Sequence, residues 1–483
     1  MSDDRSPLPL VIIGGGISGL SAAWFALESG GFAPDEVLLL EGSPRTGGKL
    51  LRGELGARNG DPVRFDLGAE STLARRPEAV DLIRAAGLGD DLVQPAVFAA
   101  SVLARGQLHR MPGGTVMGVP NDPATLQGLL DGDELQRVAA EPEIPAPALD
   151  HDVAVGSWVT ERFGRAVADR LVEPLLGGVY AGHADRLSLQ ATVPALWSLA
   201  RAGGSVLGHL PVPGPSASAT AAFAGVRGGV ARLAEVLTER LLARGVRIRT
   251  GTTVRALARS GNGWRVETGP APAPEFMDAQ RVLIAVPPPA AARLLRDECA
   301  PAARELAEIP MASMAVIAAL VPSEQVASLP VLAGSGLLVP PSEGRLIKAA
   351  TFTSSKWAWA GEAAGRDVLI RLSIGRQGEE RDLQLPDDEL ARRAIADLGS
   401  IIGRELTPSS HLVQRWGGGL PQYEVGHVDR VRRIRDAVAA RPGLAICGAA
   451  FDGVGIPACI AAARRAAGDL VRDRSAEQGR IDA

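Results

Sequence analysis

Three glycines in the stretch VIIGGGISGL have the spacing of a turn that binds phosphate. In the pattern G-x-G-x-x-G, Gly14 permits a tight turn, Gly16 lets the backbone approach a pyrophosphate, and Gly19 lets a helix pack closely on a sheet. Glu41 follows roughly 20 residues later, where an acid accepts hydrogen bonds from both ribose hydroxyls of an adenosine. These residues predict a dinucleotide site, and its turn also contains Gly15, Ile17 and Ser18.

A second glycine-rich turn, GSPRTGGKL, comes directly after Glu41. It is not a Walker A loop, because Lys49 is followed by Leu50 where that loop needs Ser or Thr. A glycine pair just beyond the ribose acid instead indicates a chain that follows a longer cofactor.

The elements that must position these residues form a βαβ unit. Residues 8–13 predict a fully buried strand, 18–29 a helix with small residues early in it, and 37–41 a second buried strand. The glycine turn then lies where the first strand meets the helix N-terminus, whose free N–H groups and partial positive charge favour phosphate.

The chain has 483 residues, too many for one compact core, so we expect two or three domains. Apolar strand-like runs that recur late in the chain predict a nucleotide domain built from separated segments. The strand-rich pattern of 311–376 predicts an antiparallel sheet in another domain. The expected units are a nucleotide-binding domain of 1–90, 222–300 and 410–475, a mainly helical insertion at 91–221, and a substrate-binding sheet domain at 301–409. The Pro- and Ser-rich stretch 210–219 predicts a linker.

Composition excludes several classes of protein. The formal net charge of -4, without a basic tail, is unlike that of a nucleic-acid binder. Three cysteines cannot all pair, which favours a reducing, cytoplasmic location. The apolar run 311–322 is too short to span a bilayer as a helix, although the loosely apolar stretch 91–221 leaves a peripheral membrane contact open. The six histidines lack metal-ligand spacing, so no metal site is expected.

Together, GGGISGLSAAW and LLLEGSPRTGGKL resemble the N-terminal signature of the superfamily of flavin monooxygenases, amine oxidases and porphyrinogen oxidases. The resemblance implies FAD as the cofactor, with Glu41 on its ribose and Arg45 near its phosphates. FDLGAEST at 65–72 resembles the stretch that lies along the ribityl chain and flavin ring in this superfamily. The further contacts implied are Gly42, Gly48, Lys49, Gly68, Ala69, Glu70 and Ser71.

Three later stretches resemble oxygen-dependent porphyrinogen oxidases: LVEPLLGGVYAGHADRLSL (171–189), RWGGGLPQYEVGH (415–427) and CGAAFDGVGIPACIAAARRAA (447–467). The last implies a helix whose N-terminus stabilises the negative charge of reduced flavin. The implied fold is α/β, with a Rossmann-like FAD-binding domain built from discontinuous segments, an α+β substrate domain and a helical insertion. The remaining cofactor neighbours implied are Val254, Trp416, Ala449, Val454, Gly455 and Ile456.

The resemblance implies an oxidase that removes six electrons and six protons from a porphyrinogen in haem biosynthesis, with O2 as acceptor and H2O2 as product. FAD carries the hydride transfer, so no catalytic base is expected. In the family that the chain resembles, the Gram-positive type acts on coproporphyrinogen III. The Ala-, Arg- and Gly-rich composition is typical of high-GC coding and favours an actinobacterial enzyme of that type. Candidate substrate contacts are four cations for the propionates and one aromatic residue, namely Arg75, Arg76, Lys348, Arg371 and Tyr423.

Three alternatives remain open at this point: a protoporphyrinogen IX oxidase, a flavin amine oxidase or carotenoid desaturase-like enzyme, and a non-catalytic protein that keeps FAD structurally. An amine oxidase is disfavoured because the chain has only two tyrosines, Tyr180 and Tyr423, for an aromatic cage. The expected partners are a porphyrinogen and O2, and a transient contact with the next enzyme of haem synthesis stays open.

Overall fold

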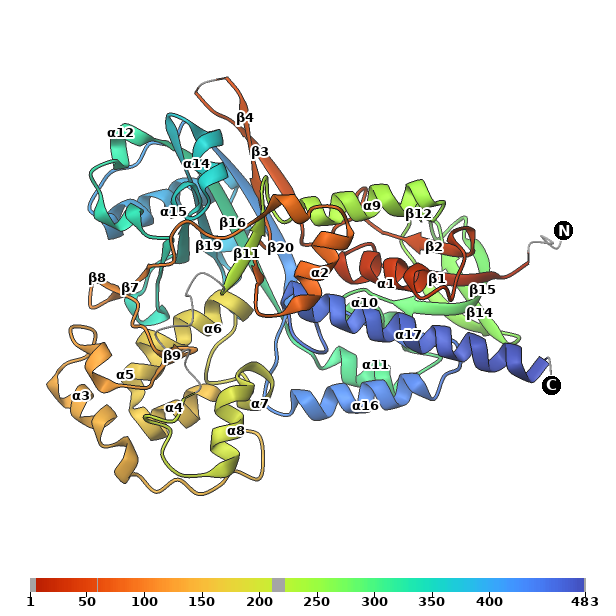
Figure 1. Cartoon of the computed structure of the whole chain (residues 1–483), viewed down its shortest axis with the longest axis horizontal. Helices are drawn as coiled ribbons and strands as arrows, with labels where there is room; N and C mark the ends of the chain where they lie inside the picture. The colour runs from red at the N-terminus through yellow and green to blue at the C-terminus, as the bar shows by residue number, and fades with distance from the viewer. Residues whose placement is uncertain (1–5, 59, 211–221, 482–483) are drawn as a thin grey trace.

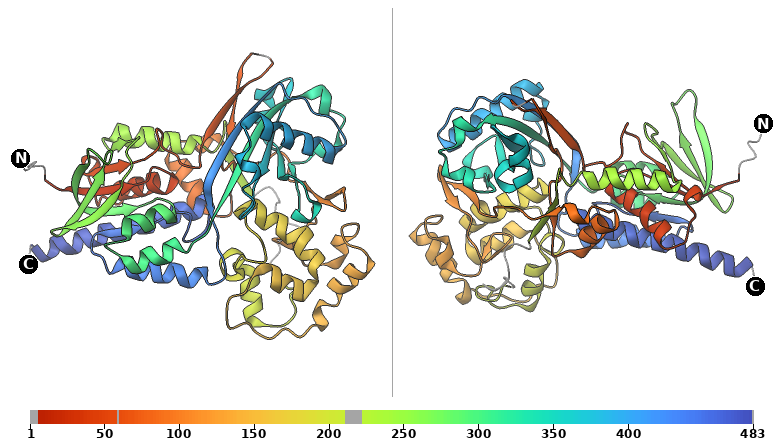
Figure 2. Two further views of the ribbon diagram at one scale, coloured as in Figure 1. Left: turned by 180° about the vertical axis from the view of Figure 1, so that it is seen from behind. Right: turned by 45° about the horizontal axis from the view of Figure 1, so that its top comes forward.

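The structure, a computed structural model, describes residues 6–58, 60–210 and 222–481. Two seven-stranded sheets form its framework, each at the centre of its own lobe (Figures 1 and 2). The helices between residues 132 and 202 gather in a third group beside the second sheet (Figure 1). Within the described ranges, no helix combines the length and the apolar character needed to cross a membrane.

The first sheet is largely parallel and carries the N-terminal glycine turn. Its strands, in spatial order, are β12 (Arg247–Arg249), β2 (Val37–Leu40), β1 (Leu8–Ile13), β15 (Glu275–Ile284), β14 (Gly263–Thr268) and β13 (Ala256–Ser260), with β21 (Leu444–Ile446) paired to β15. β1 pairs in parallel with β2 and β15, whereas β13 and β14 form an antiparallel hairpin at one edge. All four residues of β2 are buried, as expected for a strand covered on both faces.

Helices cover both faces of this sheet. One face packs against α1 (Ile17–Glu28), α2 (Pro77–Ala85), α9 (Arg232–Arg244) and α17 (Ile456–Ile481). The other face packs against α10 (Pro288–Leu295), α11 (Ala300–Ala307) and α16 (His427–Ala439). The predicted strand, turn, helix and strand are confirmed by β1, α1 and β2. The predicted Rossmann-like fold of discontinuous segments is also confirmed, because the strands of the sheet come from distant parts of the chain.

The second sheet forms the centre of the lobe at the upper left of Figure 1. Its strands, in spatial order, are β20 (Ser410–Pro421), β16 (Met311–Pro322), β19 (Asp367–Ile374), β18 (Ile347–Phe352), β17 (Gly336–Leu338), β7 (Ala100–Ala104) and β8 (Gln107–Arg110). All neighbours are antiparallel except β17 and β7. The antiparallel sheet predicted within 311–376 is therefore confirmed. One face of it packs against α12 (Ser323–Val326) and α15 (Asp387–Ile402).

This sheet extends beyond the segment 301–409 that the sequence predicted for it. β20 comes from the predicted nucleotide segment 410–475, and β7 and β8 come from the predicted helical insertion 91–221. The local sequence pattern indicates that a strand exists, but tertiary packing decides which distant strand it pairs with.

The helical group has its own core beside β7. Its helices are α3 (Gly132–Ala139), α4 (Val155–Phe163), α5 (Arg165–Val167), α6 (Glu173–Tyr180), α7 (Leu189–Thr192) and α8 (Pro194–Ala202). Smaller elements complete the fold, namely the hairpin of β3 (Arg52–Gly56) with β4 (Pro62–Asp66), the strands β5 (Thr72–Leu73), β11 (Phe223–Val226), β6 (Leu92–Val93), β9 (Thr115–Val116) and β10 (Val119–Pro120), and the helices α13 (Thr353–Lys356) and α14 (Ala358–Ala364). The predicted linker 210–219 lies, apart from Leu210, outside the described residues.

Candidate active site

The first glycine turn joins β1 to α1. Gly14 has a φ of +109°, a conformation that favours glycine. A Cβ on Gly19 would lie 1.8 Å from the carbonyl oxygen of Gly14, so the helix can approach the turn only because this side chain is absent. A Cβ on Gly16, in contrast, would meet only the Cα of Gly48, at 3.9 Å. The turn therefore leaves room at Gly16, beside the N-terminus of α1.

Glu41 lies at the carboxyl end of β2, beside this turn. Its carboxylate accepts hydrogen bonds from the N–H of Gly15 (2.6 Å) and from the N–H of Ser43 (2.7 Å). The backbone N–H of Thr252 donates to the carbonyl oxygen of Glu41 (2.8 Å), which brings the stretch that contains buried Val254 to the same edge of the sheet. Glu41, the predicted ribose acid, and Val254, the predicted neighbour of the adenine, thus lie on adjacent chain segments.

The second glycine turn contacts the first through the backbone. The N–H of Gly47 donates to the carbonyl oxygen of Gly15 (2.8 Å), and a Cβ on Gly48 would lie 3.1 Å from the Cα of Gly16. Arg45 donates from its guanidinium to the carbonyl oxygens of Thr46 and Gly48, each at 3.0 Å. These bonds hold the guanidinium of Arg45 over the second turn, while Gly42 precedes it at the surface.

Lys49 lies where several segments of the chain meet. Burial lowers the pKa of this lysine, and its side chain makes no hydrogen bond or ion pair within the described part of the chain. The thiol of Cys459, in the first turn of α17, lies near Lys49 and near Ser18 in the first turn of α1. The N-terminal turns of two helices therefore lie near one half-buried cation that forms no ion pair among the described residues.

The stretch 68–71 packs directly against this position. A Cβ on Gly68 would lie 1.8 Å from the carbonyl oxygen of Lys49 and 3.4 Å from Cζ2 of Trp416. The indole N–H of Trp416, on β20, donates to the carbonyl oxygen of Leu67 (3.1 Å). The second glycine turn, the predicted flavin stretch and the second sheet thus come together, with Ala69 and Ser71 half-buried beside them.

Glu70 joins this stretch to the second sheet. Its carboxylate forms ion pairs with Lys356 and with Arg371, and Arg371 also donates to the carbonyl oxygen of Gly68 (2.7 Å). Burial alone would raise the pKa of Glu70, but the two cations outweigh it and lower the pKa to about 2. Arg371, predicted as a propionate contact, is therefore engaged by a protein carboxylate.

Tyr423 and His427 hold the loop that precedes α17. The hydroxyl of Tyr423 donates to the carbonyl oxygen of Ala449 (2.6 Å) and accepts from the N–H of Gly453 (2.8 Å). The ring of His427 stacks on that of Tyr423 at 3.9 Å, and its Nε2 lies 3.0 Å from the carbonyl oxygen of Ala450. Because burial lowers the pKa of His427 to about 4, the ring is neutral and donates from Nε2. These bonds place the N-terminus of α17, with Val454, Gly455 and Ile456.

The other predicted substrate contacts differ in whether their side chains already have protein partners. The guanidinium of Arg76 pairs with Glu78 (2.7 Å). Lys348 is almost fully buried and donates to the carbonyl oxygen of Gly375 (2.7 Å), and burial, reinforced by Arg376, lowers its pKa to about 7. Arg75 is exposed, and its side chain has no hydrogen bond or ion pair among the described residues.

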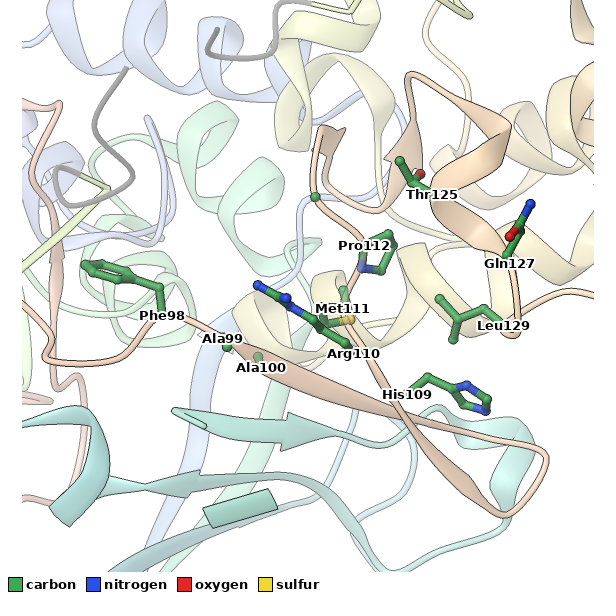
Figure 3. Close-up of a pocket in the computed structure, with 11 residues that line it drawn as sticks. Phe98, Ala99, Ala100, His109, Arg110, Met111, Pro112, Thr125, Gln127 and Leu129 are labelled. Carbon is green, nitrogen blue, oxygen red and sulfur yellow. The ribbon is translucent and has the colours of Figure 1, made fainter. Parts of the chain in front are cut away.

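A cavity of about 610 Å³ opens where β7 and β8 meet the helical group (Figure 3). No local sequence pattern indicates this cavity, because 91–221 was predicted to be mainly helical and the two strands β7 and β8 pair with a distant sheet. Its lining residues are Phe98, Ala99, Ala100, His109, Arg110, Met111, Pro112, Gly113, Thr125, Gln127 and Leu129. In the described ranges, no group of three or more His, Cys, Asp or Glu could hold a metal ion.

Known proteins are similar to this chain over nearly its whole length. The coproporphyrinogen III oxidase of Mycobacterium tuberculosis (strain H37Rv) is 35% identical over 480 residues, with 98% of this chain and 100% of the relative covered. The Bacillus subtilis coproporphyrinogen III oxidase is 32% identical, with 98% and 99% covered. The crystal structure of an Exiguobacterium protein assigned as a protoporphyrinogen oxidase is 33% identical and superimposes with a TM-score of 0.83, over 97% of this chain and 100% of that chain. Residues 17–471 match the family model of flavin-containing amine oxidoreductases, and the chain belongs to that family.

Proposed function

We propose that this protein is an FAD-dependent oxidase that converts coproporphyrinogen III to coproporphyrin III in haem biosynthesis, with O2 as acceptor and H2O2 as product. The observation that carries the proposal is the convergence at Lys49 of both glycine turns, the stretch 68–71 and the N-terminus of α17. Full-length similarity to oxidases of coproporphyrinogen III supports the choice of substrate.

The residues at this convergence fit FAD. The room beside Gly16 admits a pyrophosphate to the N-terminus of α1, and Lys49 supplies a half-buried positive charge that lacks an anion among the described residues. Arg45, held over the second turn, adds a second cation, and Glu41 offers its carboxylate to the ribose. A dianionic pyrophosphate would therefore meet the N-terminus of α1 and the cations of Lys49 and Arg45.

Bound FAD supplies the two-electron acceptor for the reaction. The chain contributes position and electrostatics, because the N-terminus of α17 stabilises negative charge that develops beside it. Tyr423 and His427 fix where that helix begins. We assign no catalytic base to the chain, because removal of hydride from a methylene bridge does not require one.

A second candidate function is the oxidation of protoporphyrinogen IX, which the similarity to the Exiguobacterium structure favours. The two substrates differ in charge, since coproporphyrinogen III has four propionates and protoporphyrinogen IX has two. We also propose a cytoplasmic location, with which the three buried free cysteines agree.

The experiment that tests the proposal is porphyrin fluorescence growth in air, with purified holoenzyme given each porphyrinogen separately. We expect faster turnover of coproporphyrinogen III, with H2O2 formed in step with porphyrin. Faster turnover of protoporphyrinogen IX would select the second candidate. The proposal would be refuted if the holoenzyme oxidised neither substrate faster than its spontaneous rate. The matched control is the same protein freed of FAD.

A further inference from the structure

Asp66 is the last residue of β4 and directly precedes the stretch 67–71, which the proposed function places along the flavin. Its side chain is buried. The carboxylate accepts hydrogen bonds from two consecutive backbone N–H groups, those of Val230 and Ala231, each at 2.9 Å. Both groups lie in the turn that leads into α9, so a carboxylate 164 positions earlier in the chain caps the N-terminus of this helix.

The turn before α9 leaves room for this carboxylate. Gly229 has a φ of +102°, which favours glycine, and a Cβ there would lie 2.8 Å from Oδ1 of Asp66. A side chain at position 229 would therefore push the carboxylate away from the two N–H groups. Burial raises the pKa of Asp66 to about 6, so the carboxyl is mostly ionised at pH 8 and its hydrogen bonds there are charge-assisted.

α9 also contacts the second glycine turn, over its first two helical turns. A Cβ on Gly47 would lie 3.2 Å from the Cβ of Ala234. The hydroxyl oxygens of Thr46 and Thr238 lie 2.8 Å apart. Since the hydroxyl of Thr238 donates to the carbonyl oxygen of Ala234 (2.7 Å), Thr46 is the donor to Thr238. One helix thus binds two segments that the proposed function assigns to FAD.

The packing of α9 keeps the helix in place. The side chains of Leu233, Leu237 and Leu241 are fully buried in the core on one face of the first sheet. Arg52 of β3 donates from Nε to the carboxylate of Glu235 (2.9 Å), and Figure 1 shows this end of α9 beside the hairpin of β3 and β4. Because the helix cannot shift without disturbing a close-packed core, a segment bound to it keeps its position.

The stretch after Asp66 is held from the second sheet as well. The carbonyl oxygen of Leu67 accepts from the indole of Trp416 (3.1 Å), and that of Gly68 accepts from Arg371 (2.7 Å). Trp416 lies on β20 and Arg371 on β19, both in the second lobe. Asp66 supplies the bond to the first lobe, so the stretch lies between a sheet on one side and the N-terminus of α9 on the other.

We infer that Asp66 is a positioning residue for the cofactor, because through the N-terminus of α9 it fixes the stretch 67–71 relative to the turn 46–48. The inference rests on the proposed function, since it takes FAD as the group that both segments contact. A stretch that moves away from the turn would lose contacts with the cofactor and would change the electrostatic surroundings of the flavin. Loss of the carboxylate should therefore change FAD binding and flavin potential in addition to stability.

The test compares Asp66→Asn with wild type at pH 8, each freed of FAD and then titrated with it. Asparagine keeps the shape of the side chain, but it offers one acceptor oxygen where the carboxylate offers two. We expect the Kd for FAD to rise about tenfold or more, because a charge-assisted hydrogen bond to α9 is lost. The midpoint potential and the visible absorption of the bound flavin should also shift.

Asp397→Asn is the matched control. The carboxylate of Asp397, on α15, also accepts from two consecutive backbone N–H groups, those of Leu346 (2.9 Å) and Ile347 (3.0 Å). This carboxylate lies in the second lobe, where α15 packs on its sheet. We expect Asp397→Asn to lower the thermal stability of the protein and to leave the Kd for FAD, the flavin potential and the absorption spectrum unchanged.

Thr46→Val tests the other segment bound to α9. It removes the hydroxyl that donates to Thr238 at a half-buried position, and we expect the Kd for FAD to rise about fivefold. The double variant with Asp66→Asn should raise the Kd by less than the product of the two single effects, because both substitutions act through α9.

An Asp66→Asn variant that loses stability, yet keeps the Kd, potential and absorption of wild type, would overturn the inference and leave Asp66 as a structural cap. If Asp66→Asn does not fold, Thr46→Val decides, and an unchanged Kd in that variant overturns the inference. These measurements follow FAD and not porphyrinogen. A wild type that binds FAD but oxidises no porphyrinogen would therefore refute the proposed function, while the Kd values would still decide the role of Asp66.

Discussion

Replacing Gly16 with alanine should separate cofactor binding from folding. The added Cβ would meet only the Cα of Gly48, at 3.9 Å, which is ordinary contact. The backbone of Gly16, at φ −71° and ψ −179°, is also open to alanine. Alanine is a poorer N-cap than glycine, so we expect the cofactor-free protein to lose about 1 kcal/mol or less of unfolding free energy.

The substitution should instead weaken the binding of FAD. The methyl group would occupy the room through which a pyrophosphate reaches the N–H groups of α1. Loss of one charge-assisted hydrogen bond costs about 1.5–3 kcal/mol, which corresponds to a Kd raised about 10- to 150-fold. Titration of cofactor-free protein with FAD, followed by flavin fluorescence, measures the Kd, and calorimetry of the same sample measures its stability.

Gly19→Ala is the matched contrast. Its Cβ would lie 1.8 Å from the carbonyl oxygen of Gly14, so the helix must move away from the turn. We expect the cofactor-free protein itself to lose about 1–3 kcal/mol or more of unfolding free energy. Wild-type affinity for FAD in a folded Gly16→Ala variant would refute the assignment of the turn to the pyrophosphate.

The remaining predictions concern three polar side chains of the site. Glu70→Ala should cost about 1.5–3 kcal/mol of unfolding free energy, because buried Arg371 and half-buried Lys356 lose their carboxylate partner, and thermal unfolding measures this loss. The pKa of Glu70 in the folded protein is about 2, below its ordinary value of 4.5. Its stabilising contribution is therefore present above pH 4.5 and is lost as the pH falls from 4.5 toward 2. A wild-type acid unfolding curve that is no steeper in this window than the curve of Glu70→Ala would contradict this prediction. Glu41→Ala should raise the Kd for FAD about tenfold without unfolding the chain, and an unchanged Kd would remove its ribose role. Tyr423→Phe should cost about 1–3 kcal/mol and shift the flavin midpoint potential, because the loop before α17 loses two hydrogen bonds; Tyr180→Phe, whose hydroxyl has no such bond among the described residues, should leave the potential unchanged.

The features that the sequence predicted well are those that short windows of residues encode. The apolar run of β1, the glycine turn and the small residues of α1 occupy consecutive positions, and the family resemblance extends them to the fold. The antiparallel strands within 311–376 follow from the same kind of local pattern.

The features that the sequence did not predict depend on pairs distant in the chain. Glu70 and Arg371 were separate candidates for flavin and propionate, yet they form one ion pair across 301 positions. This ion pair has no local signature, since tertiary packing alone brings its partners together.

The segment 421–427 shows what the porphyrinogen oxidase-like stretches do in this chain. The side-chain amide of Gln422 donates to the carbonyl oxygen of Tyr180 at the end of α6 (2.7 Å), and the N–H of Ser188 donates to the carbonyl oxygen of Tyr423 (2.8 Å). The hydroxyl of Tyr423 reaches the loop before α17. The three stretches that distinguish the chain within its superfamily therefore bind one another, and what they specify is the placement of a helix N-terminus relative to α6. A reaction whose difficult step belongs to the cofactor needs such placement more than it needs a reactive side chain.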